Sequence, residues 1–348
     1  MEMRNNSAHV NRGETMSKIT ILGSGGWGIA LSLLLLNNGN DVTVWSAFED
    51  EIETLKANRE TRLLPGVKID KAIKLTNSLD SVSHSDVVVF AVPSFAIRQT
   101  AQRIKGLINK DTVIVNVSKG VEDGTLLTLA DVIKSEIPDN KVVVLSGPSH
   151  AEEVARGMAT SLVAAADDKD AAMLVQDMFM NSFFRVYIND DITGVELGGA
   201  LKNIIALATG ICDGLGLGDN VRAALMTRGL TEMARLGVAM GAYYRTFAGL
   251  TGLGDLIVTC TSKHSRNRRF GALVGSGVNP ETALKEVGMT VEGYHATKTA
   301  VLLAKKFGVE MPITEECYAI LYEGASVQTS LERLMKRPKC DESEDMWL

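Results

Sequence analysis

The chain has 348 residues, 45% of them hydrophobic and 22% charged, which is typical of a globular protein with about two domains. Its formal net charge of -6 argues against a general nucleic-acid or anionic-membrane surface, so any anion site must be local. The 4 cysteines and 5 histidines show neither disulfide nor metal-ligand spacing, which favours reduced thiols, no bound metal and a cytoplasmic location.

Residues 1–16 are polar and contain no hydrophobic segment, so we interpret them as a disordered leader rather than a signal peptide. No uninterrupted apolar run reaches the roughly 18 residues that a spanning helix requires. The sequence therefore predicts no insertion into a membrane.

A glycine-rich turn follows the first predicted strand. Residues 19–22 are strand-prone, residues 29–36 are helix-prone, and between them lie Gly23, Ser24, Gly25, Gly26, Trp27 and Gly28. In this context Gly23 makes a tight turn, Gly25 lets backbone N–H groups approach a pyrophosphate, and Gly28 lets helix and strand pack closely. The pattern predicts a dinucleotide site, and the alternative is a strand–turn–helix connection without a ligand.

The second strand is predicted over residues 41–45, and Ser46 and Ala47 follow it. NAD-selective folds of this kind place Asp or Glu about 20 residues after the glycines, where it binds the ribose 2′-hydroxyl. Ser46 stands there instead, so we expect a cofactor contact from Ser46 and no acidic residue to exclude NADP.

Further strands are predicted over residues 86–92, 112–117, 141–145, 160–166 and 183–188, alternating with helices. Continuous apolar runs are typical of parallel strands covered on both faces, and ligands bind at the carboxyl ends of such strands. Lys119 lies at such an end and is a candidate contact, unless it is a solvated lysine. Ser149 and Glu152, after another strand, form a predicted capping box and leave N–H groups near Ala151 at the ligand edge.

From about residue 192 the pattern becomes helical. Lys202 lies one turn from Gly198 and Gly199 on a predicted helix. Glycine inside a helix costs about 1 kcal/mol relative to alanine, so something must approach closely at these positions. Either a neighbouring helix or a ligand satisfies that requirement.

Two later segments carry charge. A glycine-rich corner at residues 252–254 presents Asp255, and residues 263–269 are rich in Lys and Arg in an acidic protein. A guanidinium such as that of Arg266 matches a phosphate or a carboxylate. The alternatives are a solvated helix start and RNA binding, which lacks the interleaved aromatic residues it requires.

Taken together, these stretches resemble the bacterial NAD(P)-dependent glycerol-3-phosphate dehydrogenase family, from about residue 18 to residue 331. The stretches that carry the resemblance are residues 23–28, 118–120, 146–149, 197–203, 252–256, 265–271 and 291–294. The lysine-containing stretch 197–203 and the stretch 265–271 are the most specific. The chain departs from the family in its extra residues before Met16 and in Thr290, where a valine is usual.

The resemblance implies a Rossmann-type doubly wound sheet over residues 17–190, an all-α substrate domain over residues 191–334 and a charged tail over residues 335–348. It also implies a reversible NAD(P)H-dependent reduction of dihydroxyacetone phosphate to sn-glycerol 3-phosphate, which supplies the phospholipid backbone. By the same resemblance Lys202 donates and accepts the proton, Lys119 orients cofactor and substrate, and Asp255 holds the lysine. A cytoplasmic homodimer is expected by analogy.

The remaining site residues are carried over from the family in the same way. The cofactor contacts implied, besides Gly23, Gly25, Gly26, Gly28 and Ser46, are Ser24, Trp27, Lys119, Ala151, Arg266 and Glu292. The substrate contacts implied are Lys119, Gly147, Ser149, Lys202, Asn203, Asp255, Ser265, Arg266 and Asn267. Two other functions stay open: a related dehydrogenase acting on a 3-hydroxyacid, and a non-catalytic nucleotide sensor.

Overall fold

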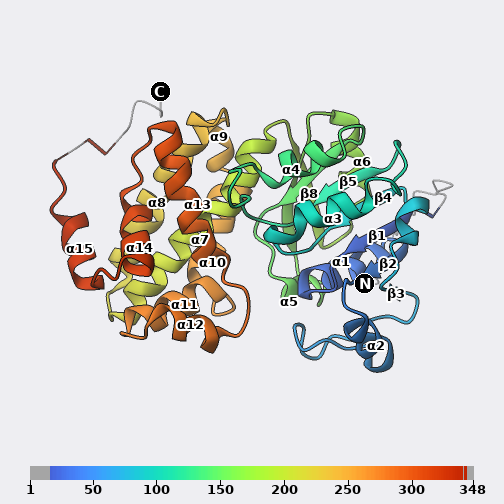
Figure 1. Ribbon diagram of the computed structural model, residues 1–348, viewed down its shortest axis with the longest axis horizontal. Coiled ribbons are helices and arrows are strands. Elements are labelled where there is room, and N and C mark those ends of the chain that lie inside the picture. The colour runs from blue at the N-terminus through green and yellow to red at the C-terminus, as the bar shows by residue number, and fades with distance from the viewer. Residues whose placement is uncertain (1–15, 340, 343–348) are drawn as a thin grey trace, which may run out of the picture.

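The computed structural model describes residues 16–339 and 341–342, in two halves that lie side by side (Figure 1). We call them the sheet half, from the first strand to the eighth, and the helical half, which follows it. Of the predicted leader only Met16 falls within the described residues. The predicted tail is described only for residues 335–339 and 341–342.

The sheet half contains one sheet of eight strands in the order β3-β2-β1-β4-β5-β6-β7-β8. All neighbouring strands are parallel except β6 and β7, which are antiparallel. The strands are β1 (Lys18–Leu22), β2 (Asp41–Trp45), β3 (Lys74–Thr76), β4 (Val87–Phe90), β5 (Val113–Asn116), β6 (Val142–Ser146), β7 (Thr160–Ala165) and β8 (Phe184–Asn189). Together with the helices on both faces, this order confirms the predicted doubly wound fold.

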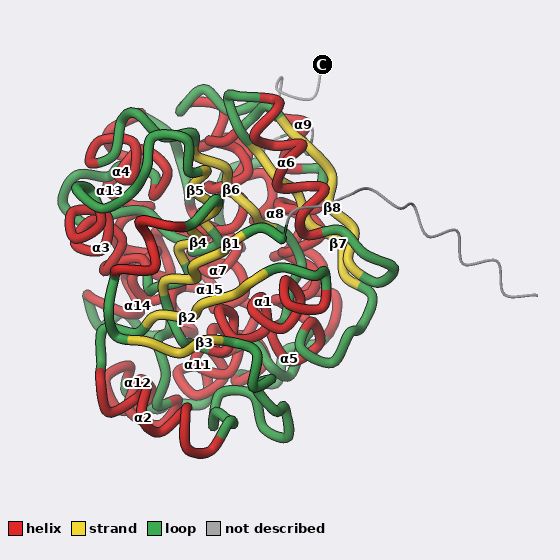
Figure 2. The backbone as a smooth tube through the Cα atoms, turned by 90° about the vertical axis from the view of Figure 1, so that its right-hand side faces the viewer, coloured by secondary structure: helices red, strands yellow, loops and turns green. Residues whose placement is uncertain are grey.

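Helices cover the sheet on both sides (Figure 2). They are α1 (Gly26–Asn37), α2 (Glu49–Asn58), α3 (Ile97–Ile104), α4 (Leu129–Glu136), α5 (Ala151–Val154) and α6 (Lys169–Phe179), with 3₁₀ turns at Asp80–His84 and Ser94–Ala96. Along β4, Val87 and Val89 pack into the core that includes α1 and α6, whereas Val88 and Phe90 pack into the core that includes α3 and α4. Burial on both faces explains why the central strands are uninterrupted apolar runs.

The strand order reverses between β1 and β4, because β1 leads outward to β2 and β3 while β4 leads to the other edge. In open sheets of this kind, ligands bind outside the carboxyl ends of the strands at such a reversal. The glycine-rich turn connects β1 to α1, so it lies at this position.

The helical half is built around α7 (Ile192–Gly214), against which α8 (Asp219–Ala239), α10 (Asp255–Thr261), α11 (Arg266–Gly275) and α13 (Glu292–Phe307) pack. The other helices are α9 (Tyr244–Phe247), α12 (Pro280–Val287), α14 (Pro312–Tyr322) and α15 (Val327–Met335), and a π-helical turn spans Leu250–Gly254. Helix α7 is long and apolar enough to cross a membrane, but its most apolar window is 100% buried in the protein. It is therefore the core helix of this half.

Helix α7 also joins the two halves. The buried Glu196 on α7 accepts hydrogen bonds from the backbone N–H of Ala130 (2.9 Å) and from Asn116 Nδ2 (3.2 Å), both in the sheet half. Burial raises the pKa of Glu196 to about 7, against the opposing effect of these hydrogen bonds. These hydrogen bonds hold α7 against the sheet half at Glu196, six residues before Lys202 on the same helix.

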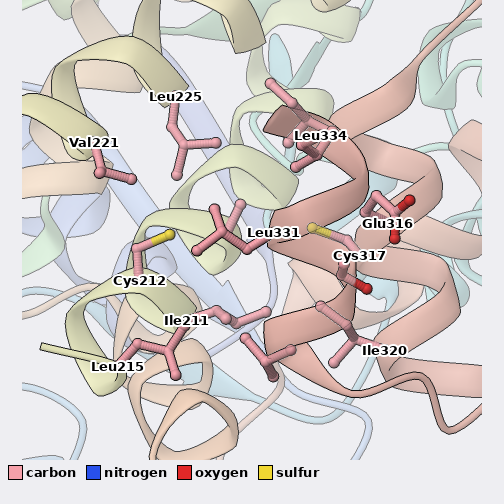
Figure 3. A pocket seen from close by; sticks show the side chains of 14 residues that line it. Ile211, Cys212, Leu215, Val221, Leu225, Glu316, Cys317, Ile320, Leu331 and Leu334 are labelled. Atoms are coloured by element: carbon pink, nitrogen blue, oxygen red, sulfur yellow. The ribbon is translucent and has the colours of Figure 1, made fainter. Parts of the chain in front are cut away.

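A cavity of about 60 Å³ lies between α7, α8, α14 and α15 (Figure 3). Its walls are almost entirely apolar and include Cys212 and Cys317. None of the residues predicted to bind cofactor or substrate lines it. The cavity is therefore separate from the candidate site.

Candidate active site

The glycine-rich turn has the geometry that a pyrophosphate requires. Gly23 has φ +125°, and a Cβ there would lie 2.5 Å from the carbonyl oxygen of Ala91. A Cβ at Gly28 would lie 2.0 Å from the carbonyl oxygen of Gly23, whereas a Cβ at Gly25 would meet nothing within 4 Å. Gly25 precedes α1 without a side-chain cap, so the first N–H groups of α1 lack a side-chain partner there. These residues fit a dinucleotide cofactor, whose phosphates would accept those hydrogen bonds.

Two lysines share one carboxylate where the halves meet. Asp255 is completely buried at the start of α10; its Oδ2 accepts a hydrogen bond from Lys119 Nζ at 2.6 Å, and its Oδ1 accepts a short one from Lys202 Nζ. Lys119 also donates to the carbonyl oxygen of Gly147 at 3.1 Å, and Lys202 donates to Thr259 Oγ1 at 2.7 Å. We call Lys119, Asp255 and Lys202 the triad. It brings together one lysine from each half.

Burial tunes the ionisation of the triad. Lys202 is only 6% exposed, and burial lowers the pKa of its amine to about 8; Asp255 opposes this shift and the nearby Lys119 adds to it. Burial disfavours the charged form of Asp255, but the two lysines outweigh it and hold the pKa of the carboxyl below its usual value. Lys202 is thus an amine that can give up and take back a proton near neutral pH.

The glycines beside Lys202 have two different neighbours. A Cβ at Gly198 would lie 2.7 Å from the carbonyl oxygen of Thr251, so this glycine admits the backbone of the π-helical turn. A Cβ at Gly199 would lie 2.9 Å from Ser146 Oγ and 3.4 Å from Lys119 Cγ. Close packing of a neighbouring element, one of the two explanations left open by the sequence, is therefore correct for Gly198. Gly199 instead gives room to the Lys119 side chain.

Asparagines from two helices meet next to Lys202. Asn267 Nδ2 donates to Asn203 Oδ1 at 2.8 Å, and Asn267 Oδ1 accepts from the backbone N–H of Gly293 at 2.8 Å. Ser265 Oγ accepts from the backbone N–H of Arg268 at 3.2 Å and so caps α11. Ser265, Asn267 and Asn203 therefore form a polar patch at the start of α11.

The arginines of the basic segment at the start of α11 have different surroundings. Arg268 is paired with Asp213, with 2.6 Å between Nε and Oδ2, so its guanidinium is already engaged. Arg266 is exposed, and its charge opposes the burial that raises the pKa of Glu292. Ser94 Oγ, on the loop after β4, donates to Glu292 Oε2 at 3.3 Å. Arg266 and Glu292 therefore lie together at the edge of the helical half that faces the sheet.

The loop after β6 differs from its prediction. Ser149 does not cap a helix: its hydroxyl donates to the carbonyl oxygen of Gly147 at 3.0 Å, and α5 begins at Ala151 after His150, without a side-chain cap. The capping box with Glu152 was wrong because Ser149 closes a tight turn within its own loop, where Gly147 has φ +145°. Helix α5 packs against α1, which places Ala151 beside the helix that follows the glycine turn.

Sequence reasoning gave no role to a pair of histidines that the structure brings together. His150, from the sheet half, and His264, from the helical half, have ring centroids 6.0 Å apart. The Nε2 atom of His150 is buried without a hydrogen-bond partner among the described residues. Burial, and then the charge of Lys202, lower the pKa of His150, so the ring is neutral near pH 7.

A carboxylate near the glycine turn was also missed. Glu51, on α2, accepts hydrogen bonds from Ser24 Oγ at 2.7 Å and from Ser46 Oγ at 2.5 Å. No acid stands at the expected position after β2, but one reaches that position from the next helix. Trp27, the other predicted contact in the turn, packs against the hydrophobic core on the α1 side of the sheet.

Comparisons with known proteins agree over most of the chain. A family model described as the NAD-dependent glycerol-3-phosphate dehydrogenase N-terminus matches residues 18–172, and the model of the C-terminus matches residues 191–332. The chain is 52% identical over 326 residues to a glycerol-3-phosphate dehydrogenase (NAD(P)+) of Clostridium perfringens strain SM101, covering 93% of this chain and 98% of that protein. The corresponding Bacillus subtilis protein is 51% identical over 336 residues, covering 95% and 97%. The crystal structure of glycerol-3-phosphate dehydrogenase from Coxiella burnetii superposes with a TM-score of 0.89 at 40% identity, covering 92% of this chain and 99% of that one.

Proposed function

Since the chain belongs to the NAD-dependent glycerol-3-phosphate dehydrogenase family, we propose that it interconverts dihydroxyacetone phosphate and sn-glycerol 3-phosphate, with Lys202 as the proton donor and acceptor. The observation that carries this proposal is the triad, a buried carboxylate shared by two lysines at the carboxyl edge of a dinucleotide-binding sheet. A protein that only senses nucleotides has no use for a buried amine of lowered pKa. The reaction would supply the glycerol backbone of phospholipids.

The chemistry at the substrate's C2 carbonyl requires a proton and a positive charge. When bound, the reduced nicotinamide supplies the hydride. Lys202 Nζ donates a proton to the carbonyl oxygen as negative charge develops there, and in the reverse direction it takes the proton from the hydroxyl. Asp255 holds Nζ in place, and the charge of Lys119 stabilises the oxyanion in a site from which water is largely excluded.

The substrate phosphate is assigned to the start of α11. Arg266 offers a guanidinium fork that carries no ion pair among the described residues, and Ser265 and Asn267 supply polar groups on the same turn. Asn203, on α7, would contact a hydroxyl of the glycerol moiety, and its hydrogen bond with Asn267 supports a position beside the phosphate site. Gly147 and Ser149 would close the other side of the substrate, from the loop to which Lys119 donates its hydrogen bond.

The cofactor is assigned to the glycine turn. Gly23, Gly25, Gly26 and Gly28 with Ser24 would hold the pyrophosphate at the start of α1. Other contacts would come from both sides of the sheet edge: Trp27, Ser46, Lys119, Ala151, Arg266 and Glu292. The hydrogen bond from Ser94 to Glu292 supports a contact of Glu292 with the cofactor, because the loop after β4 lies at the strand-order reversal.

We further propose that residues 17–190 form the dinucleotide-binding domain and residues 191–334 the substrate domain. The change from alternating strands and helices to helices alone between β8 and α7 supports this division. Assembly as a homodimer in the cytoplasm is proposed by analogy with the family, and size-exclusion chromatography with light scattering would measure the mass directly.

The test is steady-state oxidation of NADH and NADPH with dihydroxyacetone phosphate and with unphosphorylated dihydroxyacetone. We expect the wild type to turn over the phosphorylated ketone, and we expect the rate of the Lys202→Met variant to be at least about a hundredfold lower. Equal rates on both ketones would refute the assignment of a phosphate-binding site. Faster reduction of a 3-oxoacid, the oxidised form of a 3-hydroxyacid, would instead assign Arg266 to a carboxylate. Full activity in Lys202→Met would refute the assignment of the proton donor.

A further inference from the structure

Two serines that lie far apart in the sequence converge on one carboxylate oxygen. Ser24 belongs to the glycine turn and Ser46 follows β2, and the hydroxyls of both donate to Glu51 Oε2, at 2.7 Å and 2.5 Å. The backbone N–H of Phe48 donates to Ser46 Oγ at 3.3 Å, which fixes that hydroxyl in turn. The Glu51 side chain is therefore held at the point where the end of β2 meets the turn.

One oxygen of this carboxylate is free to bind something else. Glu51 is half-buried, and among the described residues both hydrogen bonds go to Oε2 while Oε1 has none. An oriented acceptor beside a dinucleotide-binding turn is suited to a ligand hydroxyl group. In this fold the hydroxyl at that point is the ribose 2′-OH of the adenosine half, next to the end of the second strand.

The first turn of α2 is also negatively charged, although the guanidinium of Arg103 stacks on Trp45 at the end of β2, 5.0 Å from the ring centroid. Glu49, Asp50 and Glu51 occupy the first turn of α2, and the helix's Lys56 lies in its last turn, where it is paired with Glu53 at 3.0 Å. A 2′-phosphate carries about -1.5 to -2 charges at neutral pH, so in NADP(H) it would be repelled by Glu51, which is the carboxylate of this turn that contacts Ser24 and Ser46. Folds that accept a 2′-phosphate place an arginine at this point instead.

We propose that Glu51 makes this protein selective for NAD(H) over NADP(H), by accepting a hydrogen bond from the ribose 2′-hydroxyl and repelling a 2′-phosphate. Ser24 and Ser46 act as positioning residues that aim the carboxylate. This inference rests on the proposed function for its cofactor. It differs from the expectation drawn from the strand end alone, where no acid was found.

The test measures binding, so that it does not depend on turnover. The intrinsic tryptophan fluorescence of the full-length protein is titrated with NADH and NADPH, and calorimetry compares 5′-AMP with 2′,5′-ADP. We expect the wild type to bind NADH at least roughly tenfold more tightly than NADPH, since two like charges about 5 Å apart at a protein surface repel by that much or more. The Glu51→Gln variant should lose most of this preference, mainly through tighter binding of NADPH.

Two further variants separate recognition from folding. Glu53→Gln removes the same charge from the same helix at an exposed position and should leave the ratio of the two affinities unchanged. Glu51→Asp keeps the charge and should keep a preference for NADH. If Glu51 had only a structural role, both Glu51 variants would change binding of the two cofactors in the same way. Equal affinities in the wild type, or an unchanged ratio in a folded Glu51→Gln variant, would overturn the proposal.

The outcomes also distinguish this inference from the function on which it rests. Turnover of dihydroxyacetone phosphate with equal use of NADH and NADPH would refute the role of Glu51 and leave the proposed function intact. Selective binding of NADH without turnover of that ketone would do the reverse.

Discussion

Replacing Asp255 with asparagine should move the ionisation of Lys202 without changing the shape of the site. In the wild type, burial lowers the pKa of Lys202 to about 8, and Asp255 prevents a larger fall. An opposite charge in direct contact raises the pKa of an amine by about 1 to 3 units, so its loss should bring the pKa of Lys202 to roughly 5 to 7. The repulsion from Lys119, no longer screened by the carboxylate, acts in the same direction.

The assay is the pH dependence of kcat/KM in both directions, because this ratio reports the ionisation of the free enzyme. Reduction needs the protonated amine, so wild-type activity should be full below about pH 8 and fall as the pH rises through that value, while oxidation should rise over the same interval. For a downward shift of about two units, the protonated fraction near pH 7.5 falls roughly 25-fold in Asp255→Asn. Reduction by the variant should therefore fail at neutral pH and recover in mild acid.

Lys119→Met supplies a test of the opposite sign. Lys119 lowers the pKa of Lys202, so removing its charge should shift the alkaline limb of the reductive profile upward, even if kcat itself falls. Thr259→Val is the matched control, because it removes the other hydrogen bond of Lys202 without removing a charge. A limb that stays at the wild-type pH in both charge variants would refute the assignment of the titrating group to Lys202.

Three predictions concern stability. Burial raises the pKa of Glu232 from 4.5 to about 7, so the folded state keeps a proton that the unfolded state releases. The free energy of unfolding should therefore fall by up to about 3 kcal/mol as the pH rises from 4.5 to 7. Thermal unfolding of Glu232→Gln should depend less on pH than that of the wild type. In Gly210→Ala the new Cβ would lie 2.1 Å from the carbonyl oxygen of Arg268, which should separate α7 from α11 and cost about 3 kcal/mol in urea denaturation. Arg333→Met removes a two-point pair with Glu316 (2.7 and 2.6 Å) and should cost no more than about 1 kcal/mol, seen as faster hydrogen exchange confined to α15.

The sheet could be predicted from the sequence because its central strands are buried on both faces. Predicted strands such as 86–92 and 112–117 contain β4 and β5 with one to two extra residues at their ends. The three-residue β3 was missed because it is too short to show a pattern. The antiparallel pairing of β6 with β7 was also not predicted, since an apolar run carries no information about strand direction.

The site could be predicted only in pieces. Lys119, Lys202 and Asp255 were each singled out, but the two hydrogen bonds that join them span 136 and 53 residues, and no local pattern encodes such a contact. Glu51 was missed for a different reason. The search for an acid counted residues along the end of β2, whereas the carboxylate arrives from the first turn of α2 and is held there by hydroxyls of two other segments.

The triad also has an energetic peculiarity that favours a role in catalysis over one in stability. Buried ion pairs contribute little net stability, because desolvation of the charges offsets their attraction. Here two ammonium groups share one carboxylate, with 8% and 19% of the lysine side chains exposed, so a net positive charge remains in a largely dry site when all three groups are ionised. This unbalanced positive charge slightly destabilises the folded enzyme when no substrate is bound. A negative oxygen placed beside the triad would balance it. The carbonyl oxygen of the substrate gains negative charge during reduction. Its attraction to the triad is therefore absent in the free enzyme and is made in the transition state, where it lowers the barrier.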